Sequence, residues 1–225
     1  MFKVNINLVI LMMKYFIGLS LISTLVAIPP YPADSLLISK EITLIKKIPL
    51  VPIAAWQRIS YNTKLLNCQF YPSCSNYGAT ALKEYGFLMG GIIASDRINR
   101  CNPFAIKYHA DLNLPYRDKD GRLIDPVSQQ STHSAKKSPF IAAFFSSILP
   151  GLGKIYAGRT MDGLTGLWTM YLTSSSTYYS IKNQKYIISP LLGIITAYVY
   201  FGEIYGAWRA VKYYQKPSKS AQIKS

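Results

Sequence analysis

The chain has 225 residues, of which half are apolar and only 16% are charged, and its mean hydropathy is +0.14. This composition excludes a disordered or fibrous protein. The 25 Lys and Arg residues against 10 Asp and Glu give a net charge of +15, which suits an anionic partner such as a nucleic acid or an acidic lipid surface. Long uncharged apolar runs lie at both ends and the basic residues lie mostly outside them, so the sequence favours a membrane protein that binds no nucleic acid.

The first 53 residues divide into an apolar start and a proline-rich linker. The only charged side chains in residues 1–28 are Lys3 and Lys14, and the uncharged run after Lys14 has 14 residues. That length is typical of a secretory signal and is shorter than the roughly 20 residues of a spanning helix. We predict a signal peptide or signal anchor over residues 1–28, with a buried core helix as the alternative. Residues 29–53 contain five prolines and are predicted to be a linker with a short amphipathic stretch over residues 35–48.

Residues 54–109 form a predicted helical module that holds all three cysteines. Its first helix starts after Pro72, with Ser73 or Ser75 as the N-cap, and ends at Gly86. A second helix runs over residues 87–100 and contains adjacent glycines at 90 and 91, which predict a close helix contact or a kink.

The three cysteines, Cys68, Cys74 and Cys101, leave their chemistry open. Five residues separate the first two, which is wider than the usual spacing of a structural zinc pair, and both histidines lie in a polar region. We therefore expect no metal and no cofactor, while a zinc site, a disulfide in an exported domain and small buried thiols remain the alternatives. No acid supports a Cys–His nucleophile, so we expect no catalytic residues and no enzyme activity.

Residues 110–138 are polar and are predicted to be a solvated linker. They hold four of the ten acidic residues, Asp111, Asp118, Asp120 and Asp125. Their spacing lacks the remaining ligands of a calcium loop.

Residues 139–225 are predicted to form a membrane hairpin domain with a basic tail. Two apolar runs, residues 163–181 and 186–208, are each of about membrane-spanning length. Seven basic residues flank the open end of this hairpin and two lie at its tip, so the positive-inside rule places the open end and the C-terminus in the cytoplasm. The flanking residues are Lys154, Arg159, Arg209, Lys212, Lys216, Lys219 and Lys224. Glu203 lies within the second run and needs a partner or water, which makes it a candidate site residue.

Pro150, Gly151 and Gly153 interrupt the apolar sequence before the hairpin. The glycines and Lys154 lack the spacing of a P-loop, so we predict a turn that lets the chain re-enter or pack tightly against a helix. With Tyr156, this stretch looks like the start of small two-helix membrane domains that carry a Pro-Gly-x-Gly-x-x-Tyr turn.

The module carries a set of spaced residues that forms a distinctive pattern: Cys68, Phe70, Pro72, Ser73, Cys74, Ser75, Tyr77, Gly86, Gly90, Arg97, Arg100, Cys101 and Pro103. This pattern resembles the YidD family of membrane protein insertion efficiency factors. The resemblance implies a small basic helper of the YidC insertase and the Sec pathway in the bacterial inner membrane, with nascent membrane proteins as further partners. Gln69 departs from the pattern, since the family commonly has a basic residue there.

The sequence thus predicts an all-α protein with a small Cys-containing module and a C-terminal transmembrane helical hairpin. We expect Arg58, Arg97 and Arg100 to contact anionic phospholipids or an acidic partner. The predicted function is assistance to membrane-protein insertion; the alternatives are an envelope structural or lipid-interacting protein and a membrane-perturbing, haemolysin-like protein. The side of the membrane that holds the module stays open.

Overall fold

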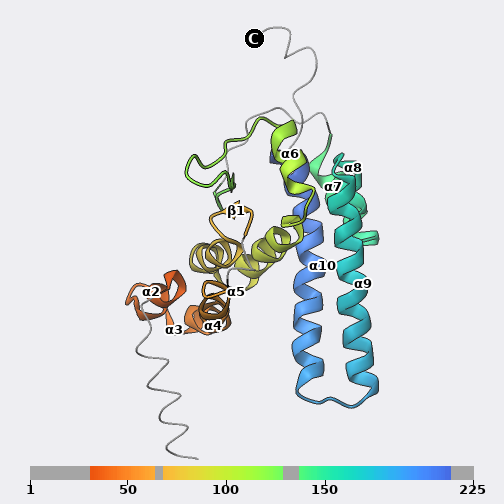
Figure 1. The fold of residues 1–225 in the computed structure, drawn as a ribbon. Helices are drawn as coiled ribbons and strands as arrows, with labels where there is room; N and C mark the ends of the chain where they lie inside the picture. The colour runs from red at the N-terminus through yellow and green to blue at the C-terminus, as the bar shows by residue number, and fades with distance from the viewer. Residues whose placement is uncertain (1–30, 64–67, 129–136, 214–225) are drawn as a thin grey trace, which may run out of the picture.

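The computed structural model describes residues 31–63, 68–128 and 137–213. The predicted signal over residues 1–28 and the tail beyond residue 213 lie outside this range. The described chain is mostly helical, and Figure 1 shows a cluster of helices, the longest of them kinked, beside a pair of long straight helices. In chain order the elements are α2 Pro32–Ile38, α3 Leu44–Lys47, α4 Leu50–Ser60, β1 Phe70–Tyr71, α5 Cys74–Arg100, α6 Ala105–Asp111, β2 Leu123–Ile124, α7 Pro139–Ile148, α8 Leu152–Tyr156, α9 Thr160–Lys182 and α10 Ile188–Tyr213.

Helix α5 is the centre of the module and is built as the sequence predicts. The Ser73 hydroxyl caps its first turn by accepting a hydrogen bond from the Asn76 N–H. Gly86 has φ +77°, a left-handed conformation that ends the first helical segment and starts the second. The kink folds the two segments together, because a Cβ on Gly90 would lie 2.7 Å from the Leu82 Cα.

The expected linker over residues 29–53 is wrong for its described part. Ala33 of α2 and Leu50 and Ala54 of α4 are buried in one apolar cluster with Ala79 and Leu82 of α5. The Gln57 side chain ties these elements together, since its Oε1 accepts from the Ala33 N–H and its Nε2 donates to Asn76 Oδ1 at 2.8 Å. Pro32 is the first residue of α2, Pro49 is the N-cap of α4 and Pro52 lies in the first turn of α4. A missing N–H costs little at these positions, so these prolines shorten the helices without preventing them.

The second expected linker, residues 110–138, also contributes to the module through its described residues 110–128. Strand β2 pairs in parallel with β1, with Phe70 opposite Leu123 and Tyr71 opposite Ile124. Phe70 and Leu123 are buried together with Ala105 of α6. The pairing places the next residue, Asp125, in the interior, where its side chain is 2% exposed. The all-α prediction therefore holds except for this small two-stranded sheet.

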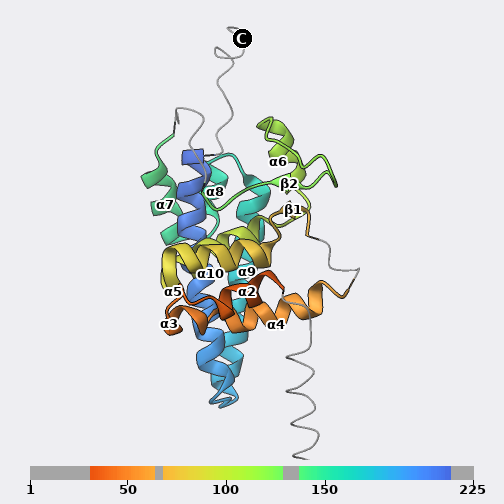
Figure 2. The same cartoon turned by 90° about the vertical axis from the view of Figure 1, so that its left-hand side faces the viewer.

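Helices α9 and α10 run antiparallel and side by side, as both Figure 1 and Figure 2 show. Hydroxyl groups of the two helices meet where the helices touch. The Thr177 and Thr196 hydroxyls lie 2.9 Å apart, and the Ser180 and Ser189 hydroxyls are also 2.9 Å apart. Of the helices that the structure describes, only α10 is long and apolar enough to cross a membrane.

The segment before the hairpin turns sharply between α7 and α8. Gly151 has φ +90°, and a Cβ there would collide with the Gly163 carbonyl of α9. A Cβ on Gly153 would collide with the Ala142 carbonyl of α7. The turn therefore needs glycine at both positions, and Tyr156 closes it by packing edge-to-face on Phe145.

Candidate functional site

The most unusual feature of the structure is a set of charged side chains buried where the module meets α8 and α10. We refer to it as the buried ion cluster; its members are Asp96, Arg97, Arg100, Asp125, Lys154, Glu203 and Arg209. Each is at most 3% exposed, and the cluster sets four cations against three carboxylates. Burying a charge costs free energy unless the charge is paired. These side chains therefore mark a junction at which the module, α8 and α10 must stay packed together.

Asp125 is the acceptor for three arginines. Its Oδ2 accepts hydrogen bonds from Arg97 Nη1 and from Arg100 Nη1, and its Oδ1 lies 3.4 Å from Arg209 Nη2. Burial by itself would raise the pKa of the Asp125 carboxyl, but the charges of Arg100, Arg209 and Arg97 outweigh it and hold the pKa well below its usual range. Asp125 is thus fixed as a carboxylate that joins α5 to α10.

Lys154 performs the same task with the opposite charge. Its Nζ lies 2.8 Å from Glu203 Oε1 and 3.5 Å from Asp96 Oδ1, so it bridges α10 and α5. Burial would lower the pKa of Lys154, but the charges of Glu203 and Asp96 raise it above its ordinary value. Asn99 also donates to Glu203, which gives the glutamate the partners that its place in an apolar run requires.

Small residues bring these elements close enough for the charges to meet. A Cβ on Gly206 would collide with the Asp96 carboxylate and lie 2.7 Å from Lys154 Cε. A Cβ on Gly202 would lie 2.8 Å from Ser95 Oγ, and one on Gly166 would strike the Glu203 carboxylate. The glycines of α9 and α10 therefore make room for the carboxylates of the cluster.

The expected lipid contact through Arg97 and Arg100 is wrong. Both side chains lie in the interior, since Arg97 is fully buried and its guanidinium stacks 3.6 Å from the centre of the Phe70 ring. Arg58 pairs with Asp34 at 2.9 Å with about a quarter of its side chain exposed. Two of the three arginines thus stabilise the module internally and cannot reach a headgroup.

The other resemblance residues surround these arginines or shape the turn before α5. The Pro72 carbonyl accepts from Arg97, the Tyr77 hydroxyl accepts from Arg209, and Ser75 accepts from Gln57. Pro103 is exposed in the turn that follows α5. Most of the motif therefore supports the core of the module.

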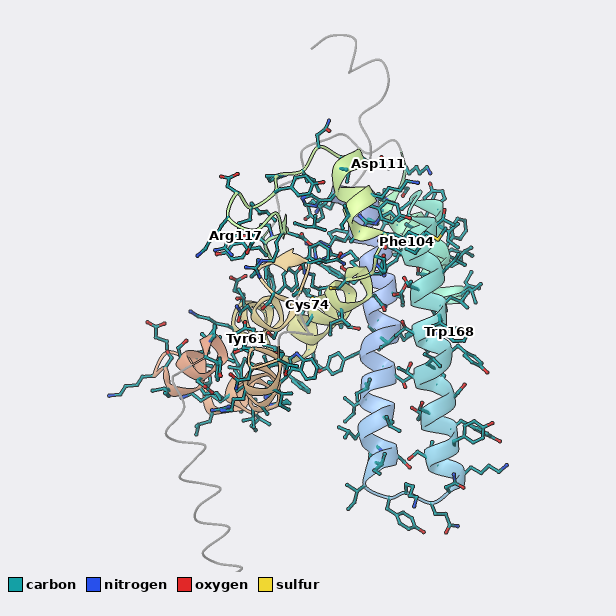
Figure 3. The ribbon with its side chains drawn as sticks, in the orientation of Figure 1. Tyr61, Cys74, Phe104, Asp111, Arg117 and Trp168 are labelled. Atoms are coloured by element: carbon teal, nitrogen blue, oxygen red, sulfur yellow. The ribbon has the colours of Figure 1, made fainter. Side chains whose placement is uncertain are left out.

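The three cysteines converge although they come from separate segments. Cys68 precedes β1, Cys74 is the first residue of α5, and Cys101 follows its last residue. Their sulfur atoms all lie within 4.8 Å of one another, and Cys68 Sγ is 3.5 Å from Cys74 Sγ. Figure 3 places Cys74 in the middle of the module. Hydrogen bonds from the Cys101 and Cys74 thiols, together with backbone N–H groups of Phe70 and Cys74, lower the pKa of Cys68.

The sequence did not indicate four members of the buried ion cluster as site residues: Asp96, Asp125, Lys154 and Arg209. A helical signal existed for Asp96, which lies four residues before Arg100 and pairs with it at 2.9 Å. No local pattern marked Asp125, because its partners come from α5 and α10. The sequence did indicate Glu203 as a residue that needs a partner.

A separate feature lies on the surface of the protein: a row of exposed apolar side chains on α3 and α4 and between them. Leu44, Ile45 and Ile48 are each more than 70% exposed, and Trp56 is half exposed. At the kink of α5, Leu88 is 71% exposed as well. Figures 1 and 2 both show α3 and α4 on the side of the module that is nearer to the loop joining α9 to α10. Exposed apolar patches of this kind are typical of membrane or protein contacts.

The family model matches most of the module and does not extend to the C-terminal helices. The YidD family model, described as "Putative membrane protein insertion efficiency factor", matches residues 45–111. A protein of that description from Thermoanaerobacter pseudethanolicus is 44% identical over 59 residues, which are 26% of this chain and 86% of the relative. One from Listeria monocytogenes is 35% identical over 91 residues, 40% of this chain and 93% of the relative. No solved structure gives a significant match. The extent and identity of these matches show that the chain belongs to the YidD family.

Proposed function

We propose that this protein is a bilayer-embedded factor that assists the insertion of integral membrane proteins through the YidC and Sec machinery. The observation that carries the proposal is the buried ion cluster, which joins a module of the YidD family to a helix that can span a membrane. The module is thereby held in a fixed position relative to the bilayer.

Helices α9 and α10 are the proposed membrane hairpin. Their 23 and 26 residues correspond to about 34 and 39 Å of helix, enough for the roughly 30 Å of a hydrocarbon core. The threonine hydroxyls of α9 find hydrogen-bond acceptors within the helix. Thr165, Thr169 and Thr173 each donate to the backbone carbonyl four residues earlier. This makes α9 compatible with lipid despite its polar composition, and its Trp168 lies on the outer side of the pair (Figure 3).

The exposed row on α3, α4 and the α5 kink supports a second membrane contact. Tyr198, in the middle of α10, donates to the Phe87 carbonyl and packs edge-to-face on the Phe87 ring. The kink of α5 therefore lies beside the part of α10 that the bilayer covers. Leu88, Leu44 and Ile48 are then positioned to enter one leaflet, as in an interfacial amphipathic segment.

Charge supports placing the open end of the hairpin and the module in the cytoplasm. Lys154, Arg159, Arg209 and Lys212 lie toward that end, whereas only Lys182 and Lys185 lie at the tip. The C-terminus is then cytoplasmic and the protein resides in the bacterial inner membrane. A module that displaces lipid from the cytoplasmic leaflet beside α10 lowers the cost for a nascent segment to enter there, which is the proposed mechanism.

The test is insertion of a YidC-dependent client in cells depleted of this chain. We expect slower acquisition of protease protection after pulse labelling, and restoration of the rate by the wild-type chain. Leu88→Lys, which places a charge on the membrane-facing side of the module, is expected to restore it poorly.

Ile106→Lys is the matched control, because Ile106 is a similarly exposed apolar residue on α6, away from the hairpin tip. It is expected to restore insertion fully. Normal client insertion after depletion, or equal rescue by both variants at equal protein levels, contradicts the proposal.

A further inference from the structure

The three cysteines form the most concentrated set of metal-ligating atoms in the described part of the chain. Cys68, Cys74 and Cys101 are 33 residues apart at most in sequence, yet their sulfur atoms lie within 4.8 Å of one another. The chain has no other cysteine. A function for this cluster is independent of the membrane role proposed above.

We propose that Cys68, Cys74 and Cys101 bind one thiophilic d¹⁰ divalent cation, with zinc as the common biological example. Three sulfur atoms at the Zn–S distance of about 2.3 Å lie about 3.8–4.0 Å from one another. The observed 3.5 Å between Cys68 and Cys74, and the 4.8 Å limit for all three pairs, bracket that separation. Small rotations of the side chains therefore bring all three sulfur atoms to bonding distance of one ion.

The surroundings suit a bound cation better than a disulfide. A disulfide requires two sulfur atoms about 2.05 Å apart and would leave the third thiol without a role. Here the third sulfur lies within 4.8 Å of both others, which suits a ligand shared by all three better than a bond between two of them. Cys74 also begins α5, where the helix dipole favours negative charge.

The coordination set is open on one side. Among the described residues, no histidine or carboxylate joins the three sulfur atoms. A cavity of about 510 Å³ borders Cys74 and Cys101, and its wall includes Trp56, Ile53 and Ile98. The cavity gives the ion an entry path and a place for water as the fourth ligand. Binding breaks each S–H bond, forms a metal–sulfur bond and releases the proton to water, so affinity rises with pH.

The experiment titrates Cd²⁺ into the reduced full-length chain in detergent, with a phosphine reductant that does not compete for the metal. We expect sulfur-to-cadmium charge-transfer absorption in the near ultraviolet that saturates at one ion per chain. Cys68→Ser, Cys74→Ser and Cys101→Ser are each expected to weaken binding by about 100-fold or more. His109→Gln is the control and is expected to bind as the wild type, because His109 contacts Pro115 and lies outside the cluster.

A second measurement needs no variant and keeps the proposal testable if a serine variant fails to fold. One equivalent of Cd²⁺ is expected to slow alkylation of all three wild-type thiols together. Absence of stoichiometric charge transfer in the reduced wild type overturns the proposal. So does a Cys68–Cys74 disulfide in protein trapped with acid from growing cells.

Discussion

At the scale of single residues, Asp125 supplies the negative charge that three buried arginines share. It is the one carboxylate that reaches Arg97, Arg100 and Arg209 together among the described residues. A buried ion pair contributes little net stability when complete, but removal of one partner leaves uncompensated charge. The stability of the junction therefore depends on Asp125 more than on any of its arginines taken alone.

Asp125→Asn is expected to reduce the free energy of unfolding by about 3–5 kcal/mol, because three buried guanidinium groups each lose an anionic partner. Denaturant unfolding of the full chain in detergent measures it. Asp120→Asn is the matched control: Asp120 is an exposed aspartate that also pairs with two arginines, Arg117 and Arg122. Its loss is expected to cost less than about 1 kcal/mol, and equal effects of the two variants would contradict the role assigned to Asp125.

The same residue predicts a pH dependence. The pKa of Asp125 is lower in the folded protein than the ordinary value near 3.9, so the unfolded chain binds its proton more readily. The stabilisation is therefore complete above about pH 5 and is lost as the pH falls below about 4. The difference in unfolding free energy between wild type and Asp125→Asn is expected to shrink over that range, as measured by denaturant unfolding between pH 3 and 7. A difference that stays constant would refute this.

At the scale of elements, the kinked α5 and the pair α9–α10 follow from local sequence, whereas the contacts between them do not. Ser73 and Gly86 are strong local signals for a helix start and a helix end, and both hold in the structure. The linker prediction for residues 29–53 is wrong over residues 32–53, because proline content disfavours a long helix but permits the short helices observed. The buried ion cluster was not predicted because its members come from α5, the end of β2, α8 and α10, which lie far apart in the sequence. Charge alone predicts a surface position.

Gly90→Ala tests the folding of α5 on itself. The added Cβ would press on the Ala81 carbonyl and the Leu82 backbone, which cannot move aside as a side chain can. We expect destabilisation of about 1–3 kcal/mol. Gly193→Ala in α10 is the control, because open space surrounds that position and alanine is expected to stabilise the helix by up to about 1 kcal/mol. Thermal unfolding followed by circular dichroism compares them, and similar midpoints for both variants would argue against the close contact.

At the scale of the whole molecule, exposed apolar side chains occur along α9 and α10 and again on α3, α4 and the α5 kink. The loop between α6 and β2 exposes the charged residues Asp118, Lys119 and Asp120. The family match explains the module but ends at residue 111, so the membrane role of the C-terminal helices depends on composition and packing.

Ile194→Lys tests whether α10 spans a membrane, since Ile194 is an exposed residue near the middle of the apolar run over residues 186–208. A lysine at the centre of a spanning helix costs about 2.5–3.5 kcal/mol, so we expect a larger fraction of the chain to be extracted from membranes by alkaline carbonate. Tyr186→Lys, at the exposed tip, is expected to remain in the membrane fraction. Equal extraction of both variants would show that α10 does not span.

The contact of Arg97 and Arg100 with distant segments also has an evolutionary consequence. These two arginines lie inside the family match, whereas Glu203 and Arg209 of the cluster lie outside it. In a chain that ended with the family segment, the surface now covered by α10 would face solvent, lipid or another protein. In this chain α10 covers that surface and makes it part of the interior. Substitutions at Asp96, Lys154 and Glu203 are therefore expected to occur together across lineages that share this architecture.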